Sequence, residues 1–374
     1  MNQLKFSHIM QQADLLAALL FACMAYAAAG RQASLWDSIE WTVLMQLLSL
    51  MLILSGLRRN GIFSVFCAFF LSRCTRMREV AFFFVNACFF LSMAVTNDAA
   101  LLMIVPETIS VCFRYGNARA MMQILILETA AANLGSMATP FGNPQNLFLY
   151  NRYALNPSSF FEITLPLTVL GGILTMISLY WIHNDPVRSQ PVLESRPFLT
   201  GQNFVWLLLL AGAMASVFRI IPAAFFFPVC LAAVCIINIC LFKETDYKLL
   251  LLFLLLFSAV GNMEKIPGFR EWAAQLLHGS ELGTAILISQ VVSNVPAAVL
   301  LSAYTEKSAA LVAGTNIGGL GTIIASMASL ISFRFYASLS GAQRIRYLWN
   351  FTKINAFFMA VLYPAAVLWI YFLS

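Results

Sequence analysis

Two polar segments of this chain repeat each other in the middle of long apolar stretches. Residues 133–147 read NLGSMATPFGNPQNL, and residues 316–330 read NIGGLGTIIASMASL. Both fit the frame N-[L/I]-G-x3-T-x2-[G/A]-[N/S]-x2-[N/S]-L. A repeated set of polar and helix-breaking residues inside apolar stretches predicts two related halves, each with an interrupted helix.

A second matched pair lies upstream of these segments. VTNDAAL at residues 95–101 and VSNVPAA at residues 292–298 align Asn97 with Asn294. Paired interruptions of hydrophobic segments are typical of secondary transporters, which bind their cargo between broken helices near the middle of the bilayer.

The composition places the chain in a membrane. Of its 374 residues, 61% are hydrophobic and only 10% are charged, and the mean hydropathy is +0.82. These polar groups are too few to cover a soluble surface of that size. Apolar stretches of about 20 residues, enough to cross a hydrocarbon core of about 30 Å, recur along the chain. We therefore expect an all-α polytopic membrane protein without a soluble domain.

The matched segments predict two inverted repeats, each with a re-entrant helical hairpin and an interrupted transmembrane helix. The expected boundaries are residues 1–182 for the first repeat, 183–202 for a cytoplasmic linker and 203–374 for the second repeat. The hairpins and interrupted helices are expected at about 79–113 and 118–150, and at about 272–304 and 308–333. Each hairpin arm reads as too short to cross the membrane comfortably, so its polar tip needs protein or a water-filled cavity around it.

The basic residues predict the orientation. With the N-terminus in the cytoplasm, roughly three quarters of the 22 Lys and Arg residues fall on the cytoplasmic side. Both ends of the first hairpin then lie inside and both ends of the second lie outside, as an inverted repeat requires. We expect a multi-pass integral protein of a bacterial inner (plasma) membrane.

The first polar segment has the composition of an ion site. Pro140, Gly142 and Pro144 open the helix, which frees backbone carbonyls and creates a half-helix N-terminus. Freed carbonyls suit a hard cation, and N–H groups favour an anion. The polar side chains at this break are Thr139, Asn143 and Asn146. A proline kink relieved by helix packing is the alternative explanation.

The second polar segment lacks prolines but keeps the frame. Its counterparts of Thr139, Gly142 and Asn143 are Thr322, Ala325 and Ser326. Its glycines weaken the helix at the same place, although glycine faces in membrane helices also serve packing alone.

The hairpin tips are the expected substrate contacts. Asn97 and Asn294 each bring an amide, with donors and an acceptor, next to a hydroxyl from Thr96 or Ser293. Such tips can hold a substrate anion on one side and a cation on the other.

Two acids within apolar segments are the candidates for ion coupling. Asp98 is costly at membrane depth unless it is paired, hydrated or functional, and we expect it to carry a proton or bind a cation. A structural acid that caps the following helix arm is the alternative. Glu128, which lies one turn before the first repeated segment, fits a proton carrier and a structural acid equally well.

These motifs resemble the ion transporter superfamily, which includes arsenite-efflux carriers, citrate carriers, divalent anion/sodium symporters and one class of Na+/H+ antiporters. The likeness lies in TND, SNV and NLGSMATPFGNPQN and covers nearly the whole chain. The chain resembles a bacterial inner-membrane member of that group. Asp98 in place of Thr is closer to the arsenite-efflux branch, and Val295 with Pro296 replaces the hydroxyl of the second tip.

The resemblance implies a scaffold domain, a transport domain and two cation sites, each built from a hairpin tip and its broken helix. It also implies a homodimer, and no cofactor other than Na+. The implied Na+ ligands are Thr96, Asn97, Gly142 and Asn143 at one site, and Ser293, Asn294, Ala325 and Ser326 at the other.

The expected function is secondary active transport of a small anion or oxyanion, such as a carboxylate, an arsenite-like species or an inorganic anion. Transport is expected to be coupled to Na+ or H+ by alternating access. A Na+/H+ antiporter of the same superfamily is the alternative. An intramembrane enzyme is disfavoured because no histidine lies at membrane depth and no second aspartate accompanies Asp98. The partners expected are the anion, Na+ or H+ and lipid, with no nucleic acid.

Overall fold

The computed structural model describes residues 2–60, 71, 73–115, 117–187 and 201–373. Within these ranges every regular element is helical. Five of the described helices are long and apolar enough to cross a membrane: α1, α2, α4, α8 and α18. The prediction of an all-α polytopic membrane protein is confirmed.

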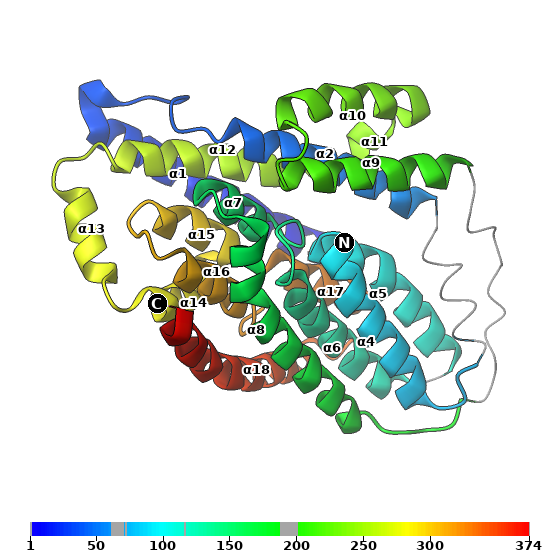
Figure 1. Cartoon of the computed structure of the whole chain (residues 1–374). Coiled ribbons are helices and arrows are strands. Elements are labelled where there is room, and N and C mark those ends of the chain that lie inside the picture. Colours follow the sequence, from blue (N-terminus) through cyan, green and yellow to red (C-terminus); the bar gives the residue numbers. More distant parts are fainter. Residues whose placement is uncertain (1, 61–70, 72, 116, 188–200, 374) are drawn as a thin grey trace.

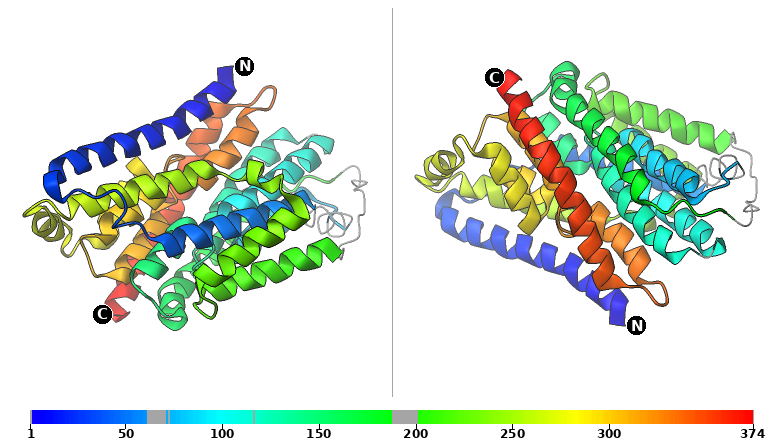
Figure 2. Two further views of the ribbon diagram at one scale, coloured as in Figure 1. Left: turned by 90° about the horizontal axis from the view of Figure 1, so that it is seen from above. Right: turned by 90° about the horizontal axis from the view of Figure 1, so that it is seen from below.

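The helices form two layers, which Figure 1 shows one above the other. The first layer consists of α1 (Asn2–Ala29), α2 (Trp41–Arg59), α9 (Gly201–Val217), α10 (Ala223–Asn238), α11 (Leu241–Glu244) and α12 (Tyr247–Met263). The second layer consists of α4 (Met77–Ala94), α5 (Asn97–Arg114), α6 (Ala118–Ser136), α8 (Pro157–Ser178), α14 (Glu281–Val292), α16 (Ser308–Gly318), α17 (Met327–Ala337) and α18 (Arg344–Leu373). Seen from above, α2, α9, α10 and α12 lie across one face with α1 along its edge, and seen from below, α18 crosses the other face (Figure 2).

Two short helices lie where the layers meet, and a third stands at one end. α7 (Pro144–Arg152) contacts α2, and α15 (Asn294–Ser302) contacts α12. α13 (Phe269–Leu277) follows α12 at the end of the molecule. Single turns of 3-10 helix, η1 (Gly30–Gln32) and η2 (Leu179–Trp181), follow α1 and α8.

The first hairpin consists of α4 and α5, which turn at Val95 and Thr96. The Thr96 hydroxyl accepts the backbone N–H of Ala99 and caps α5, as threonine commonly does at a helix start. α4 has 18 residues and counts among the membrane-spanning candidates. The arm is therefore longer than the sequence predicted, because Glu79 accepts the backbone N–H groups of Thr75 and Arg76 at the helix start and the helix runs unbroken from Met77 to Ala94.

The second hairpin consists of α14 and α15, with only Ser293 between them. Its first arm begins at Glu281 rather than near residue 272. Gly279 has a φ of +80°, a conformation that favours glycine, and separates α13 from the hairpin.

Both predicted interruptions coincide with helix ends. α6 ends at Ser136 and α7 begins at Pro144, where the Asn143 side chain accepts the N–H of Asn146 as an N-cap. α16 ends at Gly318 and α17 begins at Met327. The chain between them turns at Gly321, whose φ is +98°.

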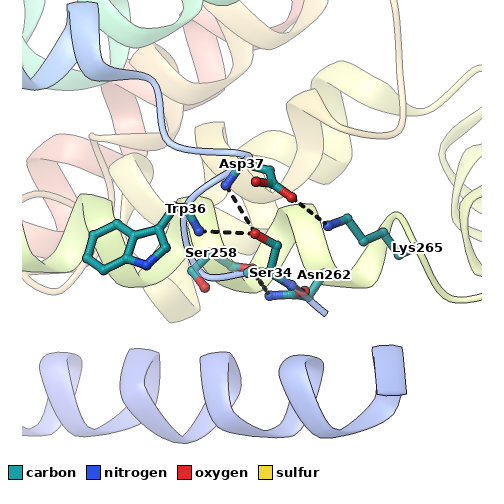
Figure 3. Close-up of polar contacts among 6 residues, drawn as sticks. All are labelled: Ser34, Trp36, Asp37, Ser258, Asn262 and Lys265. Carbon is teal, nitrogen blue, oxygen red and sulfur yellow. Dashed lines mark hydrogen bonds and ion pairs between the residues drawn. The ribbon is translucent and has the colours of Figure 1, made fainter. Parts of the chain in front are cut away.

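The connection from α1 to α2 is docked onto α12 by polar contacts (Figure 3). Asn262 accepts the Ser34 N–H at 2.9 Å and donates to the Ser34 carbonyl at 2.8 Å. Lys265 lies 3.5 Å from Asp37, and the Ser34 hydroxyl holds the pKa of Asp37 below its usual range. Most of the predicted linker, residues 183–202, lies outside the described residues.

Candidate functional site

Polar side chains from both broken helices meet at the two breaks. Asn143 donates from Nδ2 to Asn316 Oδ1 at 2.9 Å. Ser326, which holds the Asn143 position of the frame, donates to Asn133 Oδ1 at 3.2 Å. Asn133 and Asn316 share the first position of the frame. The two contacts are therefore the same bond with the two segments exchanged.

A second pair of matching bonds joins the two copies of the frame. Asn316 donates from Nδ2 to Asn146 Oδ1 at 2.6 Å. Asn133 donates from Nδ2 to the hydroxyl of Ser329, which holds the Asn146 position, at 3.5 Å. All four side chains are buried. Each broken helix thus completes the hydrogen bonding of the other.

Each hairpin tip is joined to the break of its own half by a backbone bond. The N–H of Asn97 donates to the Gly142 carbonyl at 2.9 Å, and that of Asn294 donates to the Ala325 carbonyl at 3.0 Å. Gly142 and Ala325 hold the same frame position. The tips and breaks of both halves therefore meet in the same register.

A second matching pair of bonds comes from the threonines of the frame. The Thr139 hydroxyl donates to the Met93 carbonyl at 2.8 Å, and the Thr322 hydroxyl donates to the Gln290 carbonyl at 3.3 Å. Met93 and Gln290 each precede a tip asparagine by four residues.

The carbonyls freed at the breaks are collected by amide side chains. Asn146 Nδ2 lies within 3.2 to 3.4 Å of the carbonyl oxygens of Ser136, Met137 and Thr139. A Cβ at Gly142 would come within 2.2 Å of the Ser136 carbonyl oxygen, so this turn requires glycine. In the second half the collecting amide belongs to Gln290, on the hairpin helix α14.

Sequence reasoning missed Gln290. Its Nε2 donates to the carbonyls of Gly318 at 2.7 Å and Leu320 at 3.0 Å, and its Oε1 accepts the N–H of Thr322 at 2.9 Å. A glutamine four residues before the tip asparagine was the available signal, but its counterpart in the first half is Met93, so the duplication does not mark it.

The two tips differ in backbone and in bonding. Asn97 donates from Nδ2 to Asn133 Oδ1 at 3.0 Å, and its own Oδ1 accepts the Asp98 N–H. Asn294 is equally buried, at 4% exposed, but its side chain has no hydrogen bond to the residues that the structure describes. Ser293 has φ +74° and ψ 156°, a strained region for any residue except glycine.

A cavity of about 230 Å³ lies between the layers and reaches the first tip. We call it the tip cavity. Thr96 and Asp98 line it from the second layer, Pro144 lines it from α7 where the layers meet, and residues of α2 between 47 and 58 line it from the first layer. Its charged lining residues are Arg58, Asp98, Glu244, Asp246 and Arg334. Asp98 is thus placed where a solute in the cavity can contact it.

The opposite end of α7 is fastened to the first layer by three consecutive residues. The bonds join the Tyr150 carbonyl to Arg219 at 2.9 Å, Asn151 to Gln46 at 3.0 Å, and Arg152 to Glu264 at 3.6 Å. A second cavity, of about 320 Å³, lies at this end, and neither tip is among the described residues that line it. Side-chain bonds therefore join the layers at this end, beside the second cavity.

Glu128 lies apart from both features. It is fully buried on α6, and its Oε1 accepts the Thr108 hydroxyl at 2.5 Å. Its Oε2 has no hydrogen-bond partner among the described residues. Glu128 is not among the residues that line the tip cavity. The structure thus separates the two candidate coupling acids.

The implied Na+ ligands have the right oxygen types for a hard cation, but chain donors already engage them. Thr96 Oγ1, Asn97 Oδ1, Gly142 O and Asn143 Oδ1 each accept a backbone N–H, from Ala99, Asp98, Asn97 and Asn146 respectively. In the second set, the Ala325 carbonyl accepts both the Asn294 N–H and the Ser293 hydroxyl. The residues do not form a ready cation cage in this conformation.

Comparison with known proteins supplies the family. The family model described as citrate transporter (CitMHS) matches residues 9–330. Inner membrane protein YbiR of Escherichia coli (strain K12) is 32% identical over 315 residues, which cover 79% of this chain and 80% of that protein. Uncharacterized transporter MJ0456 of Methanocaldococcus jannaschii is 30% identical over 300 residues, which cover 79% and 81%. The chain therefore belongs to the citrate transporter (CitMHS) family of the ion transporter superfamily.

Proposed function

We propose that this protein is a secondary active transporter of a small anion or oxyanion, coupled to a gradient of H+ or Na+. The tip cavity is the observation that carries the proposal. It leads from charged residues at one edge of the layers to Thr96 and Asp98 at the first tip. Carriers of this kind need a central polar site that is reached from one side at a time.

The chemistry of the breaks supports a small anionic cargo. Asn294 brings to the second tip an amide that has no hydrogen bond to the described residues, and backbone N–H groups begin α5, α7, α15 and α17 close to the network. Amide donors and helix N-termini favour negative charge. The reciprocal bonds between the broken helices support an inverted repeat, in which the cargo lies between the halves.

The bonds at the end of α7 support alternating access. With the N-terminus in the cytoplasm, the tip cavity opens toward the cytoplasm, and the bonds at Tyr150–Arg152 hold the layers together on the outer side. During transport the second layer moves against the first, so these bonds break as the tip cavity closes. Asp98 then carries the coupling ion across, because it is the acid of the hairpin tip among the residues that line the cavity.

Transport into proteoliposomes tests the proposal. Purified protein is reconstituted, and uptake of labelled citrate, arsenite, phosphate and dicarboxylates is measured under imposed H+ or Na+ gradients. We expect gradient-driven accumulation of at least one anion, and loss of that accumulation in Asp98→Asn. Uptake in Asp98→Asn with unchanged pH and Na+ dependence would remove Asp98 from the mechanism.

Asp98 on the tip cavity also favours a Na+/H+ antiporter as the second candidate. An antiporter moves protons when Na+ is added in the absence of any anion, which a pH-sensitive dye inside the proteoliposomes records. Na+-driven proton flux that no anion alters would favour the antiporter. Flux that depends on the anion would favour the carrier.

A further inference from the structure

The second half of the site is held together by Gln290, which no part of the repeated frame contains. Its side chain takes part in three bonds with the segment from Gly318 to Thr322, two as donor and one as acceptor. A Cβ at Gly321 would come within 2.3 Å of Gln290 Oε1, so the chain is closely wrapped around this amide. The break of α16 is thus built on a side chain of the hairpin.

The Gln290 amide binds the carbonyls freed at a helix break, as a bound cation would. A hard cation in a membrane protein is held by carbonyls that an unwound helix releases, and it joins the segments that supply them. Gln290 Nε2 collects two such carbonyls, from Gly318 and Leu320, at 2.7 and 3.0 Å. It also joins hairpin to break, since it belongs to α14 and the carbonyls belong to the end of α16 and the following turn.

In the first half, the carbonyls freed at the break are bonded by a different residue. There the amide that collects the freed carbonyls is Asn146, which follows the break on α7, and its three contacts are longer, at 3.2 to 3.4 Å. The residue at the Asn146 position of the second half is Ser329, which has no amide to offer. The residue at the Gln290 position of the first half is Met93. Among the described residues, therefore, only the second hairpin places an amide on the carbonyls freed at its break.

We infer that Gln290 is a positioning residue that replaces a coupling cation at the second hairpin, so that this transporter binds at most one Na+ per chain. The inference deepens the proposed function, because it concerns the ion coupling of the same site. It agrees with the second tip, where the Ala325 carbonyl is already occupied by the Asn294 N–H and the Ser293 hydroxyl.

Sodium titration of the purified full-length protein tests the inference. Thermal unfolding is followed from zero to high Na+, with choline replacing Na+ at constant ionic strength. A cation that binds only the folded state raises the Tm by mass action. We expect wild type to show no response or a hyperbolic one with a Hill coefficient no greater than one. A sigmoidal response with a Hill coefficient near two would overturn the inference.

The informative variant is Gln290→Met, which installs the residue of the matching first-half position. It frees the Gly318 and Leu320 carbonyls, so we expect a lower Tm in choline and a rise in Tm with Na+ that is larger than the rise in wild type. Gln123→Met is the matched control, because it removes one amide bond, to the Trp181 carbonyl, away from the breaks. An equal loss of Tm in Na+ and in choline for Gln290→Met would mean a purely structural role and would overturn the inference.

Direct counting decides the case if Gln290→Met does not fold. Equilibrium binding of ²²Na+ to wild type should give one ion per chain or none, and two ions per chain would contradict the inference. Neither measurement needs a cargo. Failure of the proposed function is therefore distinguishable, since it appears as absence of anion flux in proteoliposomes whatever the Na+ stoichiometry.

Discussion

The two hairpin tips bear the same asparagine, yet only one of them is fully bonded. At the first tip, Thr96 has ordinary backbone angles and caps α5, and the Asn97 side chain is bonded on both of its polar ends. At the second tip, Ser293 is strained and the Asn294 side chain has no hydrogen bond to the described residues. The first tip is therefore held by bonds within the chain, and under the proposed function the second tip is the one that would respond to cargo.

The largest expected effect concerns the residue after each asparagine. Asp98 of the first tip lines the tip cavity, whereas its counterpart Val295 is buried. Asp98→Val makes the first tip like the second, and we expect it to abolish gradient-driven uptake. Val295→Ile should leave uptake near wild type. Uptake that survives in Asp98→Val would contradict the proposal that ion coupling depends on the first tip.

The next effect compares Asn143 and Ser326, which hold the same position of the frame at the starts of α7 and α17. Asn143→Ala removes the bonds to Asn316 and Ser136 and the cap on Asn146, so we expect a loss of about 3 kcal/mol in the free energy of unfolding. Ser326→Ala removes one bond and should cost about 1 kcal/mol. Denaturant unfolding in detergent measures both. Equal losses of unfolding free energy in the two variants would show that both halves contribute equally to the stability of the network.

The strain at Ser293 can be measured with a pair of variants. Ser293→Ala and Ser293→Gly both remove the hydroxyl that donates to the Ala325 carbonyl, but only glycine adopts the local backbone freely. We expect the glycine variant to be more stable than the alanine variant by about 1 to 2 kcal/mol. At Thr96, with φ −72°, the order should reverse, because glycine there gains no relief.

The smallest expected effect lies at Asn294. Asn97→Ala removes the bond to Asn133 and should cost about 1 to 2 kcal/mol, whereas Asn294→Ala should change stability by less than about 0.5 kcal/mol without cargo. Thermal unfolding with an anion that stabilises wild type completes the test. Asn294→Ala should lose that stabilisation. A large loss of stability without cargo would show that Asn294 is structural.

Much of this arrangement could be predicted from the repeated frame. Pro, Gly and Asn act locally, so their positions predict where helices stop, and α6, α7, α16 and α17 end or begin at those positions. Length was harder to predict, because the caps that extend α4 and the turn that delays α14 lie outside the frame. The inverted orientation of the halves and the roles of individual site residues stay predictions.

Gln290 and Glu128 show why the site could be predicted only in part. Gln290 contributes through contacts with residues 28 and 30 positions away, which no local pattern records. Glu128 lies close to Asn133 in sequence, but its carboxylate bonds to Thr108 on α5 instead of joining the asparagines. Proximity along a helix does not say which face of that helix a side chain occupies, and tertiary packing decides it.

The reciprocal bonds between the broken helices have a genetic consequence. Asn143 depends on Asn316, and Ser326 depends on Asn133, so damage at one copy of the frame is felt first in the other copy. Suppressors of a defect at Asn143 should therefore arise around residue 316, in the distant half of the gene, before they arise next door. Substitutions in one copy are therefore tolerated only when the other copy changes with them.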